Sequence, residues 1–171
     1  MKSKLNKIKL VLMDVDGVLT SGKIIYNSDG QEIKEFNVQD GMAITLARMA
    51  GLKTGIITGR ISEMVKRRAE ELQFDIVSQG SFDKLPEYEK IKKELKLKDE
   101  EIVYIGDDIL DISILKRVGF SACVANARDE VKAICDYVCT AKGGDGGVRE
   151  IIDIILKRQD KLDTLIEKLT Q

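Results

Sequence analysis

The chain has 171 residues, which is enough for one domain with a single buried core. Its 28 basic and 29 acidic side chains nearly cancel, and no block of like charge occurs, so binding to nucleic acid or to a membrane surface has no support. Histidine is absent, which excludes Ser-His and Cys-His catalysis and leaves acid–base chemistry to carboxylates, lysine or metal-bound water.

Cysteine content and the N-terminal sequence indicate where the protein works. The three cysteines have no paired spacing, which favours structural thiols over disulfides or a zinc site. No apolar stretch approaches the roughly 20 residues of a membrane span. The opening MKSKLNKIKL runs directly into the first predicted strand rather than into a signal peptide. We therefore expect a cytoplasmic protein with a small-molecule partner.

The first predicted elements are a buried strand and a hairpin. Residues 8–13 are apolar and β-branched, which is typical of a central strand in a parallel sheet. Two short β-prone runs flank an Asp29-Gly30 turn, so residues 23–36 are predicted to form a hairpin. The N-terminal residues before the first strand carry no predicted element of their own.

The rest of the chain alternates between helical and strand patterns. In chain order, we expect a helix at 40–50, a strand at 54–58, a helix at 62–72, a strand at 75–78, a helix at 85–95, a strand at 102–105, a helix at 110–118, a strand at 120–124, a helix at 129–134 and a strand at 137–139. The tail, about 143–171, is amphipathic and helical from Val148, with a break near Gln159. This alternation predicts a three-layer, Rossmann-like α/β fold with a central parallel sheet, in one domain of residues 1–171.

Two acidic residues follow the first strand. Asp14 and Asp16 lie at its carboxyl end, where open α/β sheets bind their ligands, and Gly17 lets the chain leave the strand sharply. Two carboxylates that close repel each other unless a cation or a shared proton relieves them. The pair alone is weak evidence, but it predicts a divalent metal site.

Further polar residues follow later strands and should reach the same rim of the sheet. Singly, each has an ordinary explanation as a turn residue, a solvated lysine or a helix cap. Together they form a candidate active site: Thr58, Gly59, Arg60, Lys84, Asp107, Asp108 and Asp111.

This pattern resembles the haloacid dehalogenase superfamily of phosphotransferases. The motifs DVDG, ITG, Lys84 and GDDILD occur in the family's order and cover nearly the whole chain. The resemblance implies that Asp14 is the nucleophile and forms an aspartyl phosphate. It also implies that Asp16 protonates the leaving alkoxide and then deprotonates the attacking water.

The resemblance implies a cofactor as well. Mg²⁺ would be held by the Asp14 carboxylate, the Asp16 backbone carbonyl and the Asp107 carboxylate, together with waters. Asp108 and Asp111 would orient metal-bound waters or the phosphate-binding lysine.

By the same resemblance, Thr58 and Gly59 would contact the phosphoryl oxygens and Lys84 would neutralise them. The intervals between the motifs leave no room for a lid domain: residues 17–57 hold the hairpin and one helix, and residues 85–106 hold one helix and one strand. Because an uncovered site admits bulk water, something else should close it. The hairpin is a candidate for packing against neighbouring subunits, although an edge flap on a monomer is also compatible with the sequence.

Within the superfamily, FNVQDG, ITGR and GGDGGVRE resemble the lidless 3-deoxy-D-manno-octulosonate 8-phosphate phosphatase family. The resemblance implies hydrolysis of this ester to the free sugar acid and phosphate in lipopolysaccharide precursor synthesis. It also implies a homotetramer whose hairpins cover adjacent active sites, with Arg149 and the tail near a neighbouring site. The implied substrate contacts are Asp16, Asn37, Val38, Gln39, Asp40, Gly41, Arg60, Arg68 and Lys84.

Other functions remain open at this stage. A phosphatase of the nine-carbon analogue tends to carry Glu where Arg60 stands, so Arg60 favours the eight-carbon substrate. Thr45 departs from the family pattern, which often has an arginine there. A catalytically silent oligomerisation module would not need the retained acids, and a receiver-type signalling switch would need neither Asp16 nor the hairpin.

Overall fold

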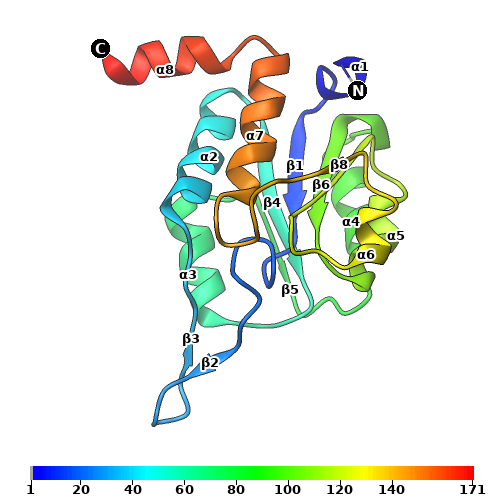
Figure 1. Ribbon diagram of the computed structural model, residues 1–171. Coiled ribbons are helices and arrows are strands. Elements are labelled where there is room, and N and C mark those ends of the chain that lie inside the picture. The colour runs from blue at the N-terminus through cyan, green and yellow to red at the C-terminus, as the bar shows by residue number, and fades with distance from the viewer. Residues whose placement is uncertain (1) are drawn as a thin grey trace.

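The computed structural model describes residues 2–171, and a six-stranded parallel sheet forms its centre (Figure 1). The sheet order is β5-β4-β1-β6-β7-β8. The strands are β1 (Leu10–Met13), β4 (Lys53–Thr58), β5 (Ile76–Gln79), β6 (Ile102–Gly106), β7 (Phe120–Cys123) and β8 (Tyr137–Val138). All six predicted strands are thus confirmed, with ends that shift by one or two residues.

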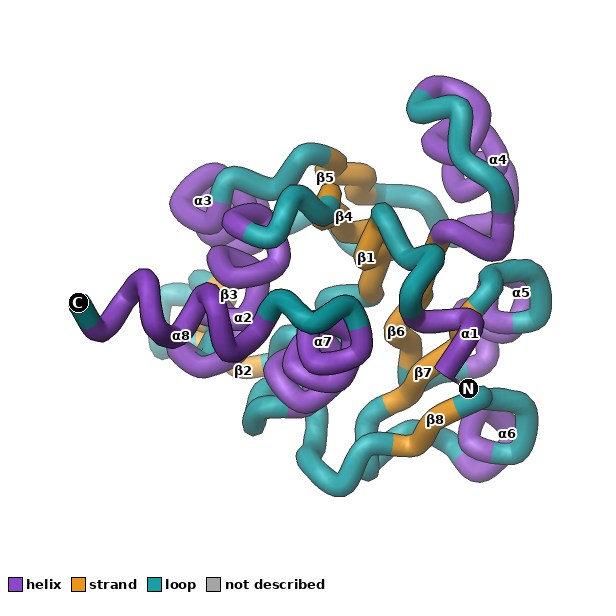
Figure 2. Tube along the Cα trace, turned by 90° about the horizontal axis from the view of Figure 1, so that it is seen from above, coloured by secondary structure: helices purple, strands orange, loops and turns teal. Residues whose placement is uncertain are grey.

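Helices cover both faces of the sheet and make the predicted three layers (Figure 2). One face carries α2 (Val38–Met49), α3 (Glu63–Leu72) and α7 (Gly147–Arg158), and the other carries α4 (Lys84–Glu94), α5 (Ile112–Leu115) and α6 (Asp129–Lys132). The helix expected at 110–118 is shorter in the structure: a 3₁₀ turn at Ile109–Asp111 leads into α5. A second 3₁₀ turn occupies Asp99–Glu101.

The N-terminus differs from the prediction. Instead of running straight into β1, it forms a short helix, α1 (Lys2–Leu5). Leu5 is fully buried, and the side-chain amide of Gln159 donates hydrogen bonds to the carbonyls of Leu5 (3.0 Å) and Ile8 (2.9 Å). Because this partner lies about 150 residues away, no local pattern could predict the helix.

Strand β1 sits at the centre and fixes the position of the site. Its four residues are fully buried, and Met13 lies beside Ile56 of β4 and Ile105 of β6. The next strand along the chain, β4, pairs with one edge of β1, and the later strand β6 pairs with the other edge. The carboxyl end of β1 is therefore a topological switch point, which is where such sheets bind ligands.

The predicted hairpin is present and projects beyond this carboxyl end (Figure 1). Its strands, β2 (Ile25–Tyr26) and β3 (Glu32–Ile33), are only two residues long each. The Asn27 side chain closes the turn by accepting hydrogen bonds from the backbone of Asp29 (3.0 Å) and Gln31 (2.8 Å). Between β1 and β4 the chain adds only this hairpin and α2.

The tail breaks where expected. Asp160 adopts a left-handed backbone with φ of 54°, and α8 (Leu162–Thr170) follows. Helix α8 lies at the end of the molecule opposite the hairpin (Figure 1). No helix in residues 2–171 combines the length and the apolar character that crossing a bilayer would require.

The glycine-rich loop before α7 supports the turn that follows β1. A Cβ atom on Gly143 would lie 1.7 Å from the carbonyl oxygen of Gly17, and one on Gly144 would lie 2.6 Å from the carbonyl carbon of Thr20. The backbone N–H of Gly144 donates to the carbonyl of Val18 at 2.9 Å. This loop is therefore more than a plain turn, because two backbones meet there without room for a side chain.

We predict that Gly143→Ala destabilises the protein by at least about 2 kcal/mol, because the new methyl group must displace the backbone at Gly17. Gly51→Ala is the control. No atom of the described residues lies within 4 Å of its Cβ position, so only the left-handed backbone contributes, at about 1 kcal/mol. Urea unfolding measures both variants. An equal loss of stability would contradict the close packing at Gly143.

Candidate active site

Asp14 is the first side chain of the site and follows β1 directly. It is 8% exposed, and its backbone N–H donates to the carbonyl of Ile105 at 3.0 Å. One carboxylate oxygen accepts from the N–H of Val15 (2.7 Å), and the other faces Nζ of Lys84 (2.8 Å). Burial and the nearby Asp111 outweigh these contacts and raise the pKa of Asp14 to about 6.

Lys84 lies between two carboxylates at the start of α4. Its side chain is 2% exposed, and Nζ lies 2.8 Å from Asp14 and 2.7 Å from Asp111. Burial by itself would lower the pKa of Lys84, but Asp111 and Asp14 together raise it. The ammonium group therefore stays charged and can bind an incoming anion beside Asp14.

Asp111 fixes the position of Lys84 through hydrogen bonds of its own. One of its oxygens accepts from Lys84 and from the hydroxyl of Tyr104 (2.8 Å), and the other accepts from the backbone N–H groups of Asp107 (2.9 Å) and Asp108 (3.2 Å). Its side chain is fully inaccessible. Sequence analysis missed Tyr104, a fully buried residue in the apolar strand β6, where a hydroxyl normally needs a partner.

Asp107 supplies the second carboxylate beside Asp14. Its Oδ1 is buried and has no hydrogen-bond partner among residues 2–171. Burial and the charges of Asp14, Asp111 and Asp108 raise the pKa of Asp107 to about 8. Gly17 leaves the space that this side chain needs, because a Cβ atom there would lie 2.1 Å from Asp107 Oδ2.

The donor set fits a hard divalent cation. One oxygen each from Asp14, Asp107 and Asp111 lies within 4.8 Å of the others. Because the oxygens of Asp111 already accept four hydrogen bonds, Asp14 and Asp107 are the two with capacity to bind metal, and the orphaned Asp107 oxygen needs such a partner. The predicted contribution of the Asp16 carbonyl stays a prediction.

Asp108 follows Asp107 at the end of β6, and its predicted role in orienting metal-bound waters stays a prediction. It is exposed, and its carboxylate accepts from the backbone N–H of Ile109 (2.7 Å) and caps the 3₁₀ turn. Of Asp108 and Asp111, only Asp111 contacts Lys84 in the described part of the chain.

Thr58 ends β4 on the neighbouring side of Asp14. It is 2% exposed, and its hydroxyl accepts from the N–H of Arg60 at 3.4 Å. Gly59 follows, and the Arg60 guanidinium pairs with Glu32 of the hairpin at 2.7 Å. The strand end therefore places a hydroxyl and backbone donors at the same rim as the acids.

Asp16 lies closer to solvent than Asp14 and pairs with the hairpin. Its carboxylate is 25% exposed and forms an ion pair with Nζ of Lys34, which in turn lies 3.5 Å from Glu32. Sequence analysis missed Lys34 and Glu32. Residues 32, 34 and 36 are half-buried, whereas residues 33 and 35 are exposed. This alternation is typical of a strand with one face toward the protein, and it is the pattern that could have indicated Glu32 and Lys34.

The predicted substrate contacts at the start of α2 divide into open and buried residues. Asn37 caps the helix by accepting from the N–H of Gln39 at 2.7 Å, and Val38 and Gln39 are exposed. Asp40 is 1% exposed and accepts from the N–H groups of Gly146 (3.3 Å) and Arg149 (2.9 Å), so it caps α7 and its side chain cannot reach a substrate. Burial raises the pKa of Asp40.

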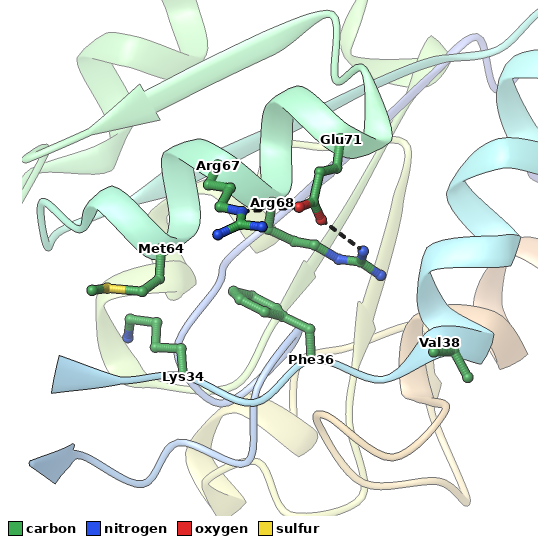
Figure 3. Close-up of a pocket in the computed structure, with 7 residues that line it drawn as sticks. All are labelled: Lys34, Phe36, Val38, Met64, Arg67, Arg68 and Glu71. Carbon is green, nitrogen blue, oxygen red and sulfur yellow. Dashed lines mark hydrogen bonds and ion pairs between the residues drawn. The ribbon is translucent and has the colours of Figure 1, made fainter. Parts of the chain in front are cut away.

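Arg68 faces a basic pocket beside the hairpin (Figure 3). Its guanidinium lies 5.9 Å from the centre of the Phe36 ring and 3.2 Å from Glu71, while its Nε is buried and has no hydrogen-bond partner in the part of the chain that the structure describes. Gly41 leaves room for it, because a Cβ there would lie 2.5 Å from Arg68 Nη2. The cavity measures about 330 Å³ and is lined by Lys34, Phe36, Val38, Met64, Arg67, Arg68 and Glu71.

Comparison with known proteins agrees with this geometry. The family signature of haloacid dehalogenase-like hydrolases matches residues 74–152. The 3-deoxy-D-manno-octulosonate 8-phosphate phosphatases KdsC of Escherichia coli K12 and Yersinia pestis are 38% and 40% identical, covering 94% and 91% of this chain and 86% and 83% of theirs.

Two solved structures are similar over most of their length. The 3-deoxy-D-manno-octulosonate 8-phosphate phosphatase from Moraxella catarrhalis, in complex with magnesium, phosphate and a KDO molecule, is 42% identical, with a TM-score of 0.96 over 98% of this chain and 97% of that one. The cobalt-bound phosphatase from Haemophilus influenzae is 37% identical, with a TM-score of 0.89 over 92% of each chain.

The fold and the acidic site define a haloacid dehalogenase-like hydrolase. Identity of 38–40% over nearly the whole length then shows the particular group: the chain belongs to the 3-deoxy-D-manno-octulosonate 8-phosphate phosphatase family.

Without divalent cations, stability should fall as pH rises. An unfolded aspartate titrates near pH 4, whereas in the fold Asp14 titrates at about 6 and Asp107 at about 8. Between these values the folded protein binds more protons than the unfolded chain. The free energy of unfolding therefore decreases with rising pH until about pH 8. Thermal melts in a chelator across this range measure the decrease.

Magnesium should raise Tm, and by more at about pH 8 than at about pH 5, because it binds the ionised carboxylates. Asp107→Asn should flatten the pH dependence and remove most of the magnesium shift, whereas Asp129→Asn, whose side chain is 99% exposed, should change neither. A full magnesium shift in the Asp107→Asn variant would rule out this residue as a ligand.

Proposed function

We propose that the protein hydrolyses 3-deoxy-D-manno-octulosonate 8-phosphate to the free sugar acid and phosphate, with Mg²⁺ as its cofactor, in lipopolysaccharide precursor synthesis. The observation that carries the proposal is Asp14, whose carboxylate lies 2.8 Å from the buried Lys84 and beside the partner-free oxygen of Asp107. This geometry supports the roles of Asp14 as nucleophile, Lys84 as the cation for the phosphoryl group and Asp107 as a metal ligand.

The reaction proceeds in two displacements. Asp14 attacks phosphorus, the bond to the sugar oxygen breaks, and Asp16 gives its proton to that oxygen. A water then attacks the aspartyl phosphate, Asp16 takes the water's proton, and phosphate leaves with Asp14 regenerated. Thr58 and Lys84 hold the phosphoryl oxygens during both steps. Magnesium, when bound by Asp14 and Asp107, supplies positive charge for the phosphoryl oxygens.

The substrate assignment rests on the basic residues near this centre. Arg60 and Arg68 lie on the hairpin side of the site, and Arg68 keeps a buried donor free at a cavity of about 330 Å³. Such groups suit a ligand that carries a carboxylate in addition to its phosphate. The similar Moraxella structure holds magnesium, phosphate and KDO.

A phosphate-release assay tests this function. We expect magnesium-dependent turnover of the eight-carbon phosphate, faster than that of the nine-carbon sugar acid 9-phosphate. Asp14→Asn should lower turnover more than about 100-fold because it removes the nucleophile, while Asp163→Asn on exposed α8 should leave turnover unchanged. Faster release from the nine-carbon compound, or release unaffected by a chelator, would contradict the proposal.

We further propose that the hairpin assembles the chain into a homotetramer and covers adjacent active sites. Ile24, Tyr26 and Ile33 on the hairpin are 57%, 61% and 47% exposed, and Phe82 at the rim of the site is 73% exposed. Such apolar side chains are typical of an interaction surface, and a two-stranded hairpin alone is marginally stable. Covering the site would also exclude water from the reaction.

The double variant Ile24→Ser/Tyr26→Ser should sediment as a smaller assembly and lose activity, because it removes the apolar contact area. The matched control is Ile166→Ser/Leu169→Ser, which changes two apolar residues of α8 that are 45% and 49% exposed, at the opposite end of the molecule (Figure 1). A hairpin variant of unchanged size would refute assembly through this element.

The cytoplasm is the location we propose for this protein. Cys123, Cys135 and Cys139 are all free thiols, and Cys135 is only half-buried. Thiols in this state are typical of a reducing compartment.

A further inference from the structure

Lys34, at the base of the hairpin, forms the second buried lysine–carboxylate pair of the site. Its side chain is 3% exposed, and its Nζ pairs with Asp16 and lies 3.5 Å from Glu32. Lys84, the other buried lysine, contacts Asp14 and Asp111. Each of the two acids that follow β1 therefore has a lysine of its own, and the two lysines come from unrelated elements.

Glu32 anchors this lysine to the body of the domain. One of its oxygens lies 2.7 Å from Nη2 of Arg60, and the other accepts from the hydroxyl of Ser62 at 3.0 Å. Strand β3 is thereby fixed to the segment that joins β4 to α3. Lys34 is consequently held over the site of its own subunit, whereas Ile24 and Tyr26 point outward from the hairpin.

An acid–base group on a loop needs such a restraint. Asp16 is one-quarter exposed, and Lys34 is the one residue of the described chain that donates to its carboxylate. It also lies two residues from Asp14, and an unpaired carboxylate there would be attracted to any divalent cation that Asp14 and Asp107 bind. A carboxylate that ligates the metal is no longer available for proton transfer.

Taking the proposed phosphatase function as its basis, we propose that Lys34 is a positioning residue. It holds the Asp16 carboxyl group through Oδ1 and out of the metal site, which leaves Oδ2 to carry the proton toward the leaving-group oxygen. Glu32 completes the device by fixing Lys34 to Arg60 and Ser62. The hairpin thus contributes to leaving-group protonation in its own subunit, a role separate from subunit assembly.

Aryl phosphates provide the test, because they lack the sugar acid. Phenyl phosphate needs a proton on its leaving oxygen, whereas 4-nitrophenyl phosphate releases a stable anion. Lys34→Met should lower kcat/KM for phenyl phosphate about tenfold more than for 4-nitrophenyl phosphate, since only the first depends strongly on a well-placed acid. Lys34→Arg should restore part of the difference. Lys23→Met, an exposed lysine of the same hairpin, should change neither value.

Two results would overturn the proposal. An equal loss for both aryl phosphates would show a general effect on the site, and a loss confined to the sugar acid phosphate would make Lys34 a substrate contact. Should Lys34→Met fail to fold, Glu32→Gln weakens the anchor with the lysine in place, and it should give the same selective loss at smaller size. A wild-type protein inactive on the sugar phosphate but active on aryl phosphates would refute only the proposed substrate.

Discussion

The site depends on repulsion among three buried carboxylates that a single lysine partly compensates. Asp14, Asp107 and Asp111 bring three carboxylates within 4.8 Å in a buried pocket, and Lys84 is the one cation of the described residues that contacts more than one of them. Their burial and mutual repulsion raise the pKa values of Asp14 and Asp107. A divalent cation would relieve this unfavourable cluster, so affinity for metal and the raised pKa values have the same origin.

The scaffold holds the cluster by backbone packing more than by side chains. β1 is fully buried between β4 and β6, which fixes where Asp14 begins. The turn after it has no space to move, because Gly17 meets Asp107 on one side and Gly143 on the other. Asp40 fastens α2 to the same glycine loop through Gly146. Motifs that lie far apart in the sequence are therefore packed together around the carboxyl end of β1.

The sequence predicted the sheet and the rim of acids because both follow from local patterns: apolar runs alternate with amphipathic helices, and Asp14 and Asp107 come directly after such runs. Long-range pairing could not be predicted this way. Asp40 was expected to contact the substrate, yet it caps α7, and its partner Gly146 lies 106 residues along the chain. Lys34 was missed because the inward face of a hairpin depends on how it folds back, and its partner Asp16 belongs to another element.

The most direct measurement is a crystal structure grown with magnesium and beryllium fluoride, which mimics a phosphoryl group on a carboxylate. The account predicts beryllium bonded to an oxygen of Asp14, a cation shared by Asp14 and Asp107, and Lys84 within hydrogen-bond distance of fluorine. An adduct on any other side chain, or a magnesium-loaded site with Asp14 unmodified, would contradict the central role given to this residue.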